Sequence, residues 1–285
     1  MNTYREKIHL RTDEIHASIG PRWDFRDVCH VWAAPRRTKT NFSLPRAMRR
    51  AVAELHYCAM NLLLLGKGKT GSLVADVARE HRHQVRALAS GDNPGGAALV
   101  REKLRGVDVV IDFTTPKAAV ENITACARAG ASMVIGTTGW YGELPRIREL
   151  VENSGIGFLY ASNFSLGVNV FFDIAHAAAT ALGKGYSGAI EERHHAQKKD
   201  KPSGTAAVLQ KILKEKSGVE LEINSVREGD IVGTHIITLR SAGDTITLAH
   251  EAHSRRGFAE GAVRAAEWLA GKKGFFDFKD VWRSL

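Results

Sequence analysis

Short apolar runs alternate with amphipathic segments along the chain from about residue 60. The apolar runs predict strands at 61–65, 84–88, 107–112, 132–135 and 156–160, and helical spacing predicts helices at 71–80, 116–129 and 142–153. Strands that are apolar throughout are buried on both faces, as in a parallel sheet covered by its connecting helices. This part of the pattern therefore predicts an α/β fold with a doubly wound parallel sheet.

The pattern changes after about residue 165. A predicted helix at 168–182 is followed by a strand at 188–193, a helix at 205–216 and meandering strands at 220–227, 233–240 and 244–251. This order predicts an α+β domain whose sheet could also form contacts between subunits. The last predicted helix, 259–270, and the aromatic tail at 275–278 are expected to pack back on the first domain.

Composition and charge narrow the class of protein. The chain has 285 residues, 44% of them hydrophobic, and no apolar run approaches the roughly 18 residues of a membrane span. Cys29, Cys58 and Cys126 form no CxxC motif, which is typical of a reducing compartment and not of a disulfide scaffold or zinc site. We expect a soluble, cytoplasmic protein.

The net charge is +9, but residues 1–59 hold 11 Lys and Arg against 6 Asp and Glu. The rest of the chain is therefore only mildly basic, which suits anionic small molecules at least as well as a polyanion. No nucleic-acid recognition module is evident beyond the first 59 residues. The sequence predicts a small-molecule substrate and neither a nucleic-acid nor a membrane partner.

A glycine-rich motif follows the first predicted strand. Residues 66–71 read G-x-G-x-x-G, between the apolar run 62–65 and a helical pattern. The order strand, glycine loop, helix is typical of a Rossmann unit, in which the pyrophosphate of a dinucleotide lies against the helix N-terminus. The alternative is a plain glycine turn. The predicted cofactor-binding residues are Gly66, Lys67, Gly68, Lys69, Thr70 and Gly71.

The second predicted strand favours one form of the cofactor. An NAD-binding Rossmann unit usually carries an acid after this strand to bind the ribose hydroxyls, and here the first acid is Asp92. Lys67 and Lys69 would tolerate or favour a 2′-phosphate. We therefore expect NADPH or NADH as the cofactor, with a preference for NADPH.

Two loops that follow later strands carry hydroxyl groups and tight turns. They are residues 112–116, which include Phe113 and Thr114, and residues 136–139, which include Gly136, Thr137 and Thr138. Ligands of a doubly wound sheet bind at the carboxyl ends of its strands, so both loops are candidates for holding a nicotinamide ribose or carboxamide. Taken in isolation, such short segments would more often be ordinary loops.

Residues 194–206 combine proton donors, cations and an anion-binding turn. His194, His195 and Lys198 can exchange protons near neutral pH. The turn at 202–205 ends on a Ser/Thr helix cap, so the amides of Gly204 and Thr205 would point outward at a helix N-terminus, where a carboxylate or phosphate binds readily. The alternative is a solvated basic loop before a capped helix.

From Met60 to the C-terminus the chain carries, in order, the motifs GKGKTG, IDFTTP, VIGTTG, ASNFSLGVN, HHAQKKDKPSGTA, GDIVGTH and HSRRGFAEGAVRAAEW. In these motifs it resembles the dihydrodipicolinate reductase (4-hydroxy-tetrahydrodipicolinate reductase) family of the diaminopimelate and lysine pathway, and the resemblance covers about four-fifths of the chain. It implies NAD(P)H-dependent reduction of 4-hydroxy-tetrahydrodipicolinate to tetrahydrodipicolinate, without a metal, by a homotetramer.

The resemblance also implies roles for individual residues. His194 would be the proton donor and acceptor, Lys198 the general acid, and His195 with Gly204 and Thr205 would bind a substrate carboxylate. Thr138 would contact both substrate and cofactor. Besides the glycine loop, the implied cofactor-binding residues are Phe113, Thr114, Gly136, Thr137, Thr138, Ala161, Ser162, Asn163 and Phe164.

This chain departs from the family pattern in four places. Leu65 stands where the family often has its first glycine, Ala196 and Gln197 replace commoner basic residues, and the ribose-binding acid is missing. The first 59 residues have no counterpart in the family.

Together the patterns divide the chain into four predicted parts. These are an N-terminal extension at 1–59 that is partly disordered, a dinucleotide-binding domain at 60–164, a substrate-binding and oligomerisation domain at 165–256, and a C-terminal helix and tail at 257–285 that return to the dinucleotide-binding domain. Met60 directly precedes the first strand and would be a natural start for the folded body.

Three other functions stay open on the residues alone. Another Rossmann-type oxidoreductase, acting on an amino-acid-derived imine or aldehyde, would share residues 60–164. A metal-dependent hydrolase could use His194 and His195 with His250 or His253 as ligands. A non-catalytic protein that senses nucleotides or binds nucleic acid would use the basic charge.

Overall fold

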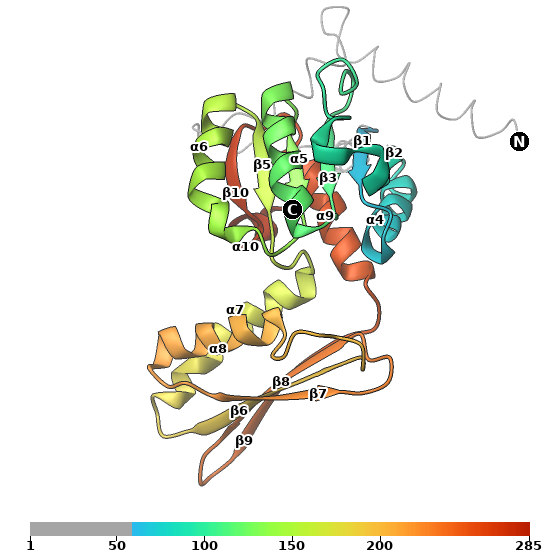
Figure 1. Ribbon diagram of the computed structural model, residues 1–285. Coiled ribbons are helices and arrows are strands. Elements are labelled where there is room, and N and C mark those ends of the chain that lie inside the picture. Colours follow the sequence, from blue (N-terminus) through green and yellow to red (C-terminus); the bar gives the residue numbers. More distant parts are fainter. Residues whose placement is uncertain (1–58) are drawn as a thin grey trace, which may run out of the picture. The chain divides into compact units, whose positions relative to one another are not determined.

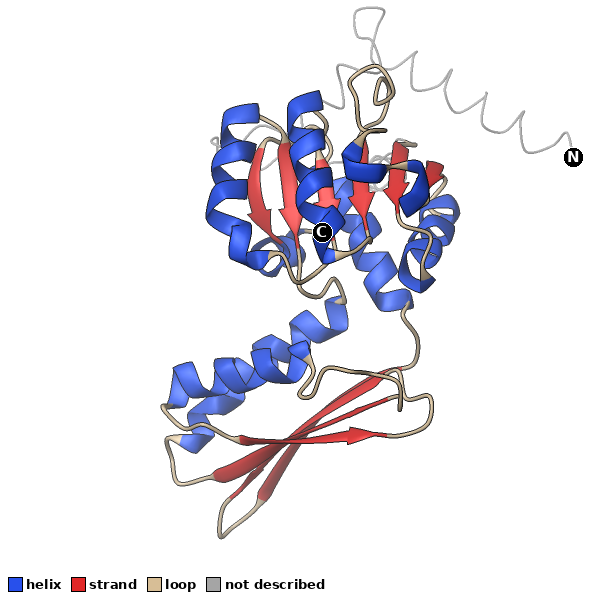
Figure 2. Cartoon of the chain, viewed as in Figure 1, coloured by secondary structure: helices blue, strands red, loops and turns tan. Residues whose placement is uncertain are grey.

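The computed structural model describes residues 59–285 (Figures 1 and 2). The predicted N-terminal extension lies outside the described residues, apart from Ala59. In chain order the strands and helices are β1 (Asn61–Leu65), α4 (Lys69–Glu80), β2 (Gln84–Leu88), β3 (Val109–Asp112), α5 (Pro116–Ala129), β4 (Met133–Ile135), α6 (Leu144–Ser154), β5 (Gly157–Tyr160), α7 (Leu166–Leu182), β6 (Ser187–His194), α8 (Gly204–Ser217), β7 (Glu222–Arg227), β8 (Gly233–Arg240), β9 (Thr245–Ala252), α9 (Arg256–Leu269), β10 (Gly274–Asp277) and α10 (Phe278–Val281).

The first sheet has six parallel strands in the order β10-β5-β4-β3-β1-β2. The side chains of β1 show why its sequence is apolar throughout: Leu62 and Leu64 pack with α4 and α9, whereas Leu63 and Leu65 pack with α5 and α6. Helices therefore cover both faces, as Figure 2 shows. The predicted doubly wound parallel sheet is confirmed.

The strand order reverses at β1, because β2 lies on one side of this strand and β3 on the other. At such a switch point the connections leave on opposite faces of the sheet, and the carboxyl ends of the two central strands border a crevice. The loops after β1 and β3 flank this crevice. The topology thus places the glycine motif where a doubly wound sheet binds its ligands.

The second sheet has four strands in the order β7-β6-β8-β9 and is mixed (Figure 1). Apolar side chains of β6 and β8, including Ile190 and Ile237, pack against Phe171 of α7 and Leu209 of α8. The predicted α+β architecture is confirmed, but the strands do not form a simple meander. β7 pairs in parallel with β6, because α8 carries the chain back before β7 begins.

The predicted element ends agree with the structure to within three residues, except in the C-terminal tail. We expected residues 275–278 to return to the first domain but did not predict a strand there. The tail forms β10, in which Phe275 pairs with Phe158 across a parallel ladder and the two rings stack 5.2 Å apart. So short a run has no periodicity of its own, and the open edge of β5 supplies its hydrogen-bond partners.

Phe164 anchors the connection between β5 and α7. Its ring is 2% exposed and lies 4.8 Å from the ring of Phe278 and 6.2 Å from that of Phe113, between centroids. Its carbonyl meets α9 at Gly261, where a Cβ atom would lie only 1.8 Å from the oxygen. A glycine is required there because the helix and the connecting backbone are in direct contact.

Among the described residues, no helix is both long and apolar enough to cross a membrane.

We predict that Gly261→Ala lowers the free energy of unfolding by roughly 1–3 kcal/mol, because the added methyl forces α9 away from the Phe164 carbonyl. Urea denaturation measures the change. Gly142→Ala is the matched control, since a Cβ at Gly142 meets nothing within 4 Å, and it should stay within about 0.5 kcal/mol of the parent. Equal stability of the two variants would contradict the close contact.

Candidate active site

The three glycines of the loop after β1 have different roles. Gly66 has a φ of +97°, and a Cβ there would lie 2.3 Å from the Phe113 carbonyl oxygen. A Cβ on Gly71 would lie 2.2 Å from the carbonyl oxygen of Gly66. Gly68, at the N-terminus of α4, meets nothing within 4 Å. Two glycines thus allow close packing, and the third leaves the helix N-terminus open to a ligand.

A pocket of about 400 Å³ lies at this switch point. Its walls come from the loops after β1, β3 and β4 and from one residue that follows β9. The lining residues are Gly68, Lys69, Thr70, Gly71, Phe113, Thr114, Pro116, Gly136, Thr137, Thr138 and Arg255. Nine of the predicted cofactor-binding residues therefore share one pocket, whereas Pro116 and Arg255 were not among the predicted residues.

The buried carboxylate of Asp112 organises the pocket loops. Its Oδ1 accepts hydrogen bonds from the Thr114 amide (2.8 Å), the Thr114 hydroxyl (2.8 Å) and the Thr137 hydroxyl (2.7 Å). The Thr137 hydroxyl in turn accepts from the Thr114 amide at 2.7 Å. Asp112 has no exposed surface, so these donors stabilise a charge that water cannot reach. The loops after β3 and β4 are thereby held together.

The same carboxylate is linked to the turn after β2. Asn122 Nδ2 donates to Asp112 Oδ2 at 2.7 Å, and Asn93 Nδ2 donates to Asn122 Oδ1 at 2.9 Å. Asn93 Oδ1 accepts from the Ala98 amide at 2.9 Å. This chain of buried amides fixes the turn where a Rossmann unit recognises the cofactor ribose.

The residues of the pocket fit a dinucleotide. The first turn of α4 contains no acid, so its N-terminus is suited to an anion. Asp92, the first acid after β2, accepts a hydrogen bond from the Ala89 amide at 3.0 Å within its own turn. Leu65, which stands where the family often has its first glycine, is the last residue of β1 and is buried in the core, so the chain turns at Gly66 instead.

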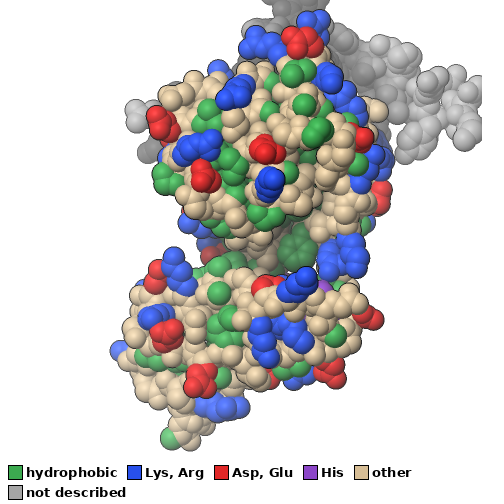
Figure 3. All heavy atoms as spheres, viewed as in Figure 1, with side chains coloured by type: hydrophobic (Ala, Val, Ile, Leu, Met, Phe, Trp, Pro, Cys, Tyr) green, Lys and Arg blue, Asp and Glu red, His purple; other side chains and the backbone are tan. Residues whose placement is uncertain are grey.

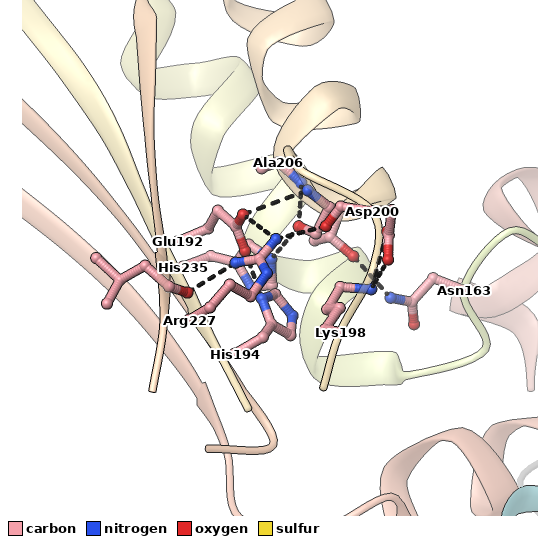
Figure 4. Close-up of polar contacts among 11 residues, drawn as sticks. Asn163, Glu192, His194, Lys198, Asp200, Ala206, Arg227 and His235 are labelled. Atoms are coloured by element: carbon pink, nitrogen blue, oxygen red, sulfur yellow. Dashed lines mark hydrogen bonds and ion pairs between the residues drawn. The ribbon is translucent and has the colours of Figure 1, made fainter. Parts of the chain in front are cut away.

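A second group of polar residues gathers at the carboxyl end of β6 (Figure 4). His194 is the last residue of β6 and is 8% exposed, with Nδ1 in contact with Glu192 Oε2. Burial lowers the pKa of His194, and the contact with Glu192 offsets part of this effect. His235 of β8 lies edge-on to His194, with ring centroids 5.2 Å apart, and burial lowers its pKa to about 4. This histidine is therefore neutral near pH 7.

Lys198 lies in the loop after β6 and is paired with Asp200, with Nζ 2.7 Å and 2.9 Å from the two carboxylate oxygens. Burial acts to raise the pKa of Asp200, but the hydrogen bonds and charge of Lys198 outweigh it and lower the pKa. His195 is half-buried, and its backbone amide donates to the Ile231 carbonyl at 2.7 Å. His194 and Lys198 thus occur together in one cluster, as Figure 4 shows.

Ser203 is the cap of α8, and the helix begins at Gly204. Its hydroxyl accepts from the Ala206 amide at 3.2 Å and lies 3.2 Å from His235 Nε2. The first amides of a helix have no partner within the helix, so those of Gly204 and Thr205 are available to an anion. A Cβ on Gly204 would meet nothing within 4 Å, which shows that the approach is open.

The four residues of segment 161–164 differ in their exposure and contacts. The side chains of Ala161 and Phe164 are buried in the core, so only their backbone could face a cofactor. Ser162 is exposed. Asn163 Nδ2 donates to Thr205 Oγ1 at 3.3 Å, which links this segment to the start of α8.

The structure does not assemble the ligands of the hydrolase alternative. In the described part of the chain, the donor groups that converge around His194 are those of Glu192 and His235, and neither His195, His250 nor His253 joins them. On the face shown in Figure 3, acidic side chains are interspersed among Lys and Arg side chains. This mixed surface offers little to the nucleic-acid alternative.

Sequence reasoning missed Glu192, Arg227, His235 and Arg255 as parts of these sites. Glu192 had one detectable signal, because residues two apart in a strand share a face and Glu192 therefore lies beside His194. Arg227 and His235 come from neighbouring strands, and their positions depend on the pairing of β6 with β7 and β8. No local sequence pattern predicts the register in which these strands pair.

We predict that Thr137→Val lowers the free energy of unfolding by roughly 1–3 kcal/mol, because it removes a donor to buried Asp112 and the acceptor of the Thr114 amide. Urea denaturation measures the loss. Thr138→Val, at the exposed neighbouring position, should change stability by less than about 0.5 kcal/mol. A Thr137→Val variant as stable as its control would show that the network contributes little.

Two family models match consecutive parts of the chain. The N-terminal region of dihydrodipicolinate reductase matches residues 60–164, and its C-terminal region matches residues 167–282. The first of these is a nucleotide-binding Rossmann domain, which supports a pyridine nucleotide as the cofactor.

Individual proteins show the same relationship. The 4-hydroxy-tetrahydrodipicolinate reductase of Christiangramia forsetii is 41% identical over 240 residues, which cover 79% of this chain and 99% of that protein. The corresponding protein of Chromobacterium violaceum is 40% identical over 199 residues, which cover 62% and 74%. In fold, the chain is similar to the dipicolinate-bound dihydrodipicolinate reductase from Paenisporosarcina sp. TG-14, with a TM-score of 0.64 at 23% identity over 78% of this chain and 99% of that one. The chain belongs to the dihydrodipicolinate reductase family.

Proposed function

We propose that this protein is an NAD(P)H-dependent oxidoreductase that reduces 4-hydroxy-tetrahydrodipicolinate to tetrahydrodipicolinate in lysine and diaminopimelate biosynthesis. The observation that carries the proposal is the cluster after β6, where His194 and Lys198 lie near the open N-terminus of α8. Proton donors beside an anion-binding turn suit a substrate that bears carboxylates and must gain a proton. Relatives that carry this activity in their names match most of the chain.

Each site residue has a role in this proposal. The amides of Gly204 and Thr205 hold one carboxylate of the substrate, and His195 and Thr138 contact it from the neighbouring loops. A reduced nicotinamide bound in the switch-point pocket supplies a hydride. The substrate loses its 4-hydroxyl group as water and gains the hydride and one proton, so that the reaction balances. Lys198, kept close by Asp200, acts as the general acid, and His194 donates or accepts the proton of the reduction.

The remaining features of the proposal rest on the fold. The cofactor-binding residues are those of the pocket, together with Gly66, Lys67 and the segment 161–164, and Arg255 adds a cation to them. The outward face of the β6–β9 sheet is available for a homotetramer. Residues 60–164 serve as the dinucleotide-binding domain, 165–256 as the substrate domain and 257–285 as the returning segment. The scattered cysteines support a cytoplasmic location.

The decisive experiment follows NADPH oxidation by absorbance, with freshly generated 4-hydroxy-tetrahydrodipicolinate as the substrate. We predict that Lys198→Ala lowers turnover by roughly a hundredfold or more and leaves NADPH binding nearly intact, because a positioned acid acts mainly in the transition state. Lys199→Ala, which removes the exposed neighbouring charge, should retain turnover. Activity of the parent chain only on another imine or an aldehyde would favour a different Rossmann-type reductase.

The cofactor preference can be tested at Lys69, which lines the pocket. We predict that NADPH is used at least as well as NADH, because β2 ends without an acid for the ribose hydroxyls and the first acid, Asp92, accepts a hydrogen bond within its own turn. Lys69→Ala should weaken NADPH binding more than NADH binding, by roughly 0.5–2 kcal/mol. Isothermal titration with both cofactors measures the difference, and Lys211→Ala on the exposed face of α8 controls for net charge. Equal losses would place Lys69 at the shared pyrophosphate.

A further inference from the structure

Glu192 is a buried carboxylate that the proposed reaction does not yet use. It has no exposed surface and lies two residues before His194 on the same face of β6. Its Oε2 contacts His194 Nδ1, and its Oε1 accepts from Arg227 Nη2 at 2.7 Å and from the Ser203 amide at 3.4 Å (Figure 4). Both oxygens are therefore occupied by groups that belong to, or border, the candidate active site.

The contacts of Glu192 extend to the turn before α8. Arg227 Nη2 also donates to the Asp200 carbonyl at 2.6 Å, so the guanidinium joins Glu192 to the loop that carries Lys198. Ser203, whose amide faces Glu192, caps α8. The carboxylate thus bonds both to the ring of His194 and to the backbone that presents the anion-binding amides.

Charge determines how Glu192 can bond. Burial by itself would raise the pKa of this carboxyl, but hydrogen bonds from Arg227, Ser225 and His194 outweigh it and lower the pKa to about 2. At neutral pH Glu192 is therefore ionised and can only accept hydrogen bonds. The proton of a neutral His194 must then reside on Nδ1, which leaves Nε2 as the atom that exchanges protons.

We propose that Glu192 is the positioning residue of the active site: it holds His194 in the Nδ1–H tautomer and fixes that ring relative to the turn at Ser203. The proposal rests on the proposed reductase function only for the catalytic role of His194. The tautomer itself follows from the contacts of the carboxylate. Glu192 touches neither substrate nor cofactor and acts through the histidine.

The substitution Glu192→Gln should invert the tautomer of His194. Arg227 is always charged and can only donate, so the carbonyl of a glutamine must face Arg227 and the Ser203 amide. The glutamine NH₂ group then faces His194 Nδ1, which must become the acceptor. Neutral His194 would carry its proton on Nε2, and Nε2 could no longer accept one.

The experiment compares Glu192→Gln with Glu191→Gln in the full chain. Glu191 is the neighbouring residue of β6, points to the other face of the sheet and pairs with Arg193 at 2.7 Å. Nitrogen-15 NMR of labelled histidine distinguishes the two neutral tautomers, and the signals of His194 are assigned by their loss in His194→Asn. We expect Nδ1–H in the parent and in Glu191→Gln, and Nε2–H in Glu192→Gln.

Turnover should follow the tautomer. A wrong histidine tautomer has cost about 10⁴-fold in another enzyme class, and we expect Glu192→Gln to lose roughly a hundredfold or more in kcat, with a smaller change in the KM for the nucleotide. Glu192→Asp keeps the negative charge but places it farther from His194, because the aspartate side chain is one methylene shorter. This variant should therefore keep the Nδ1–H tautomer and recover part of the lost turnover. Glu191→Gln should retain parental turnover.

The pH profile adds a readout that a loss of packing would not produce. The charged or titratable groups that act on His194 are Glu192 from β6, Arg227 from β7, His235 from β8 and Lys198 from the loop. Glu192 favours the protonated ring, so removing its charge lowers the pKa of His194. The loss of activity that accompanies protonation of His194 at Nε2 should then begin at a lower pH in Glu192→Gln.

The outcomes separate this proposal from the proposed function. The proposal is overturned if Glu192→Gln keeps the Nδ1–H tautomer, if it inverts the tautomer but keeps full turnover, or if Glu192→Asp loses as much turnover as Glu192→Gln while both unfold cooperatively. If the parent does not reduce the proposed substrate, the function fails, but the tautomer measurement needs no substrate and still tests the contact. An Nε2–H tautomer in the parent would refute the contact directly.

Discussion

Two carboxylates without exposed surface, Asp112 at the end of β3 and Glu192 near the end of β6, impose the main constraint on this molecule. A buried charge is stable only if its oxygens are hydrogen-bonded, so the surrounding chain must supply donors at defined positions. For Asp112 these donors come from Thr114, Thr137 and Asn122. Each carboxylate thereby holds its neighbouring loops in a defined arrangement of backbone amides and hydroxyls. Both candidate binding regions are built on this principle.

The two regions also share the use of an open helix N-terminus. α4 begins beside Gly68 and α8 begins at Gly204, and in both cases a Cβ at the glycine would meet nothing within 4 Å. The positive end of a helix favours an anion, and a glycine lets the anion approach the amides closely. The same physics thus suits a pyrophosphate at α4 and a carboxylate at α8. What differs is the neighbouring chemistry, because only α8 has the histidines and Lys198 beside it.

Much of the fold could be predicted because its signals are local. Runs of Leu and Val buried on both faces identify the parallel strands, and the helical spacing of apolar residues identifies the helices between them. β10 escaped prediction because its pairing depends on the edge of β5, and the parallel position of β7 depends on where α8 releases the chain. For the candidate site, the sequence indicates the residues whose type suits the chemistry, such as His194 and Lys198. For Glu192 it offers only the spacing of two residues from His194, and for Arg227 it offers no signal, because the importance of both depends on what they contact.

The sequence alone determines the order of the strands and helices along the chain, the two helix N-termini that begin at or beside a glycine, and the family resemblance. Each of these depends on residues that are close together in the chain. Only the tertiary structure decides that Asp112 reaches Asn122 and, through it, Asn93, that Arg255 joins the nucleotide pocket, and that Glu192 meets His194 and Arg227 together. The physical reason is that these contacts join segments whose separation is set by sheet order and register. Hydrogen bonds to Glu192 then outweigh the effect of burial and keep this carboxylate ionised, which determines the position of the proton on the histidine beside it.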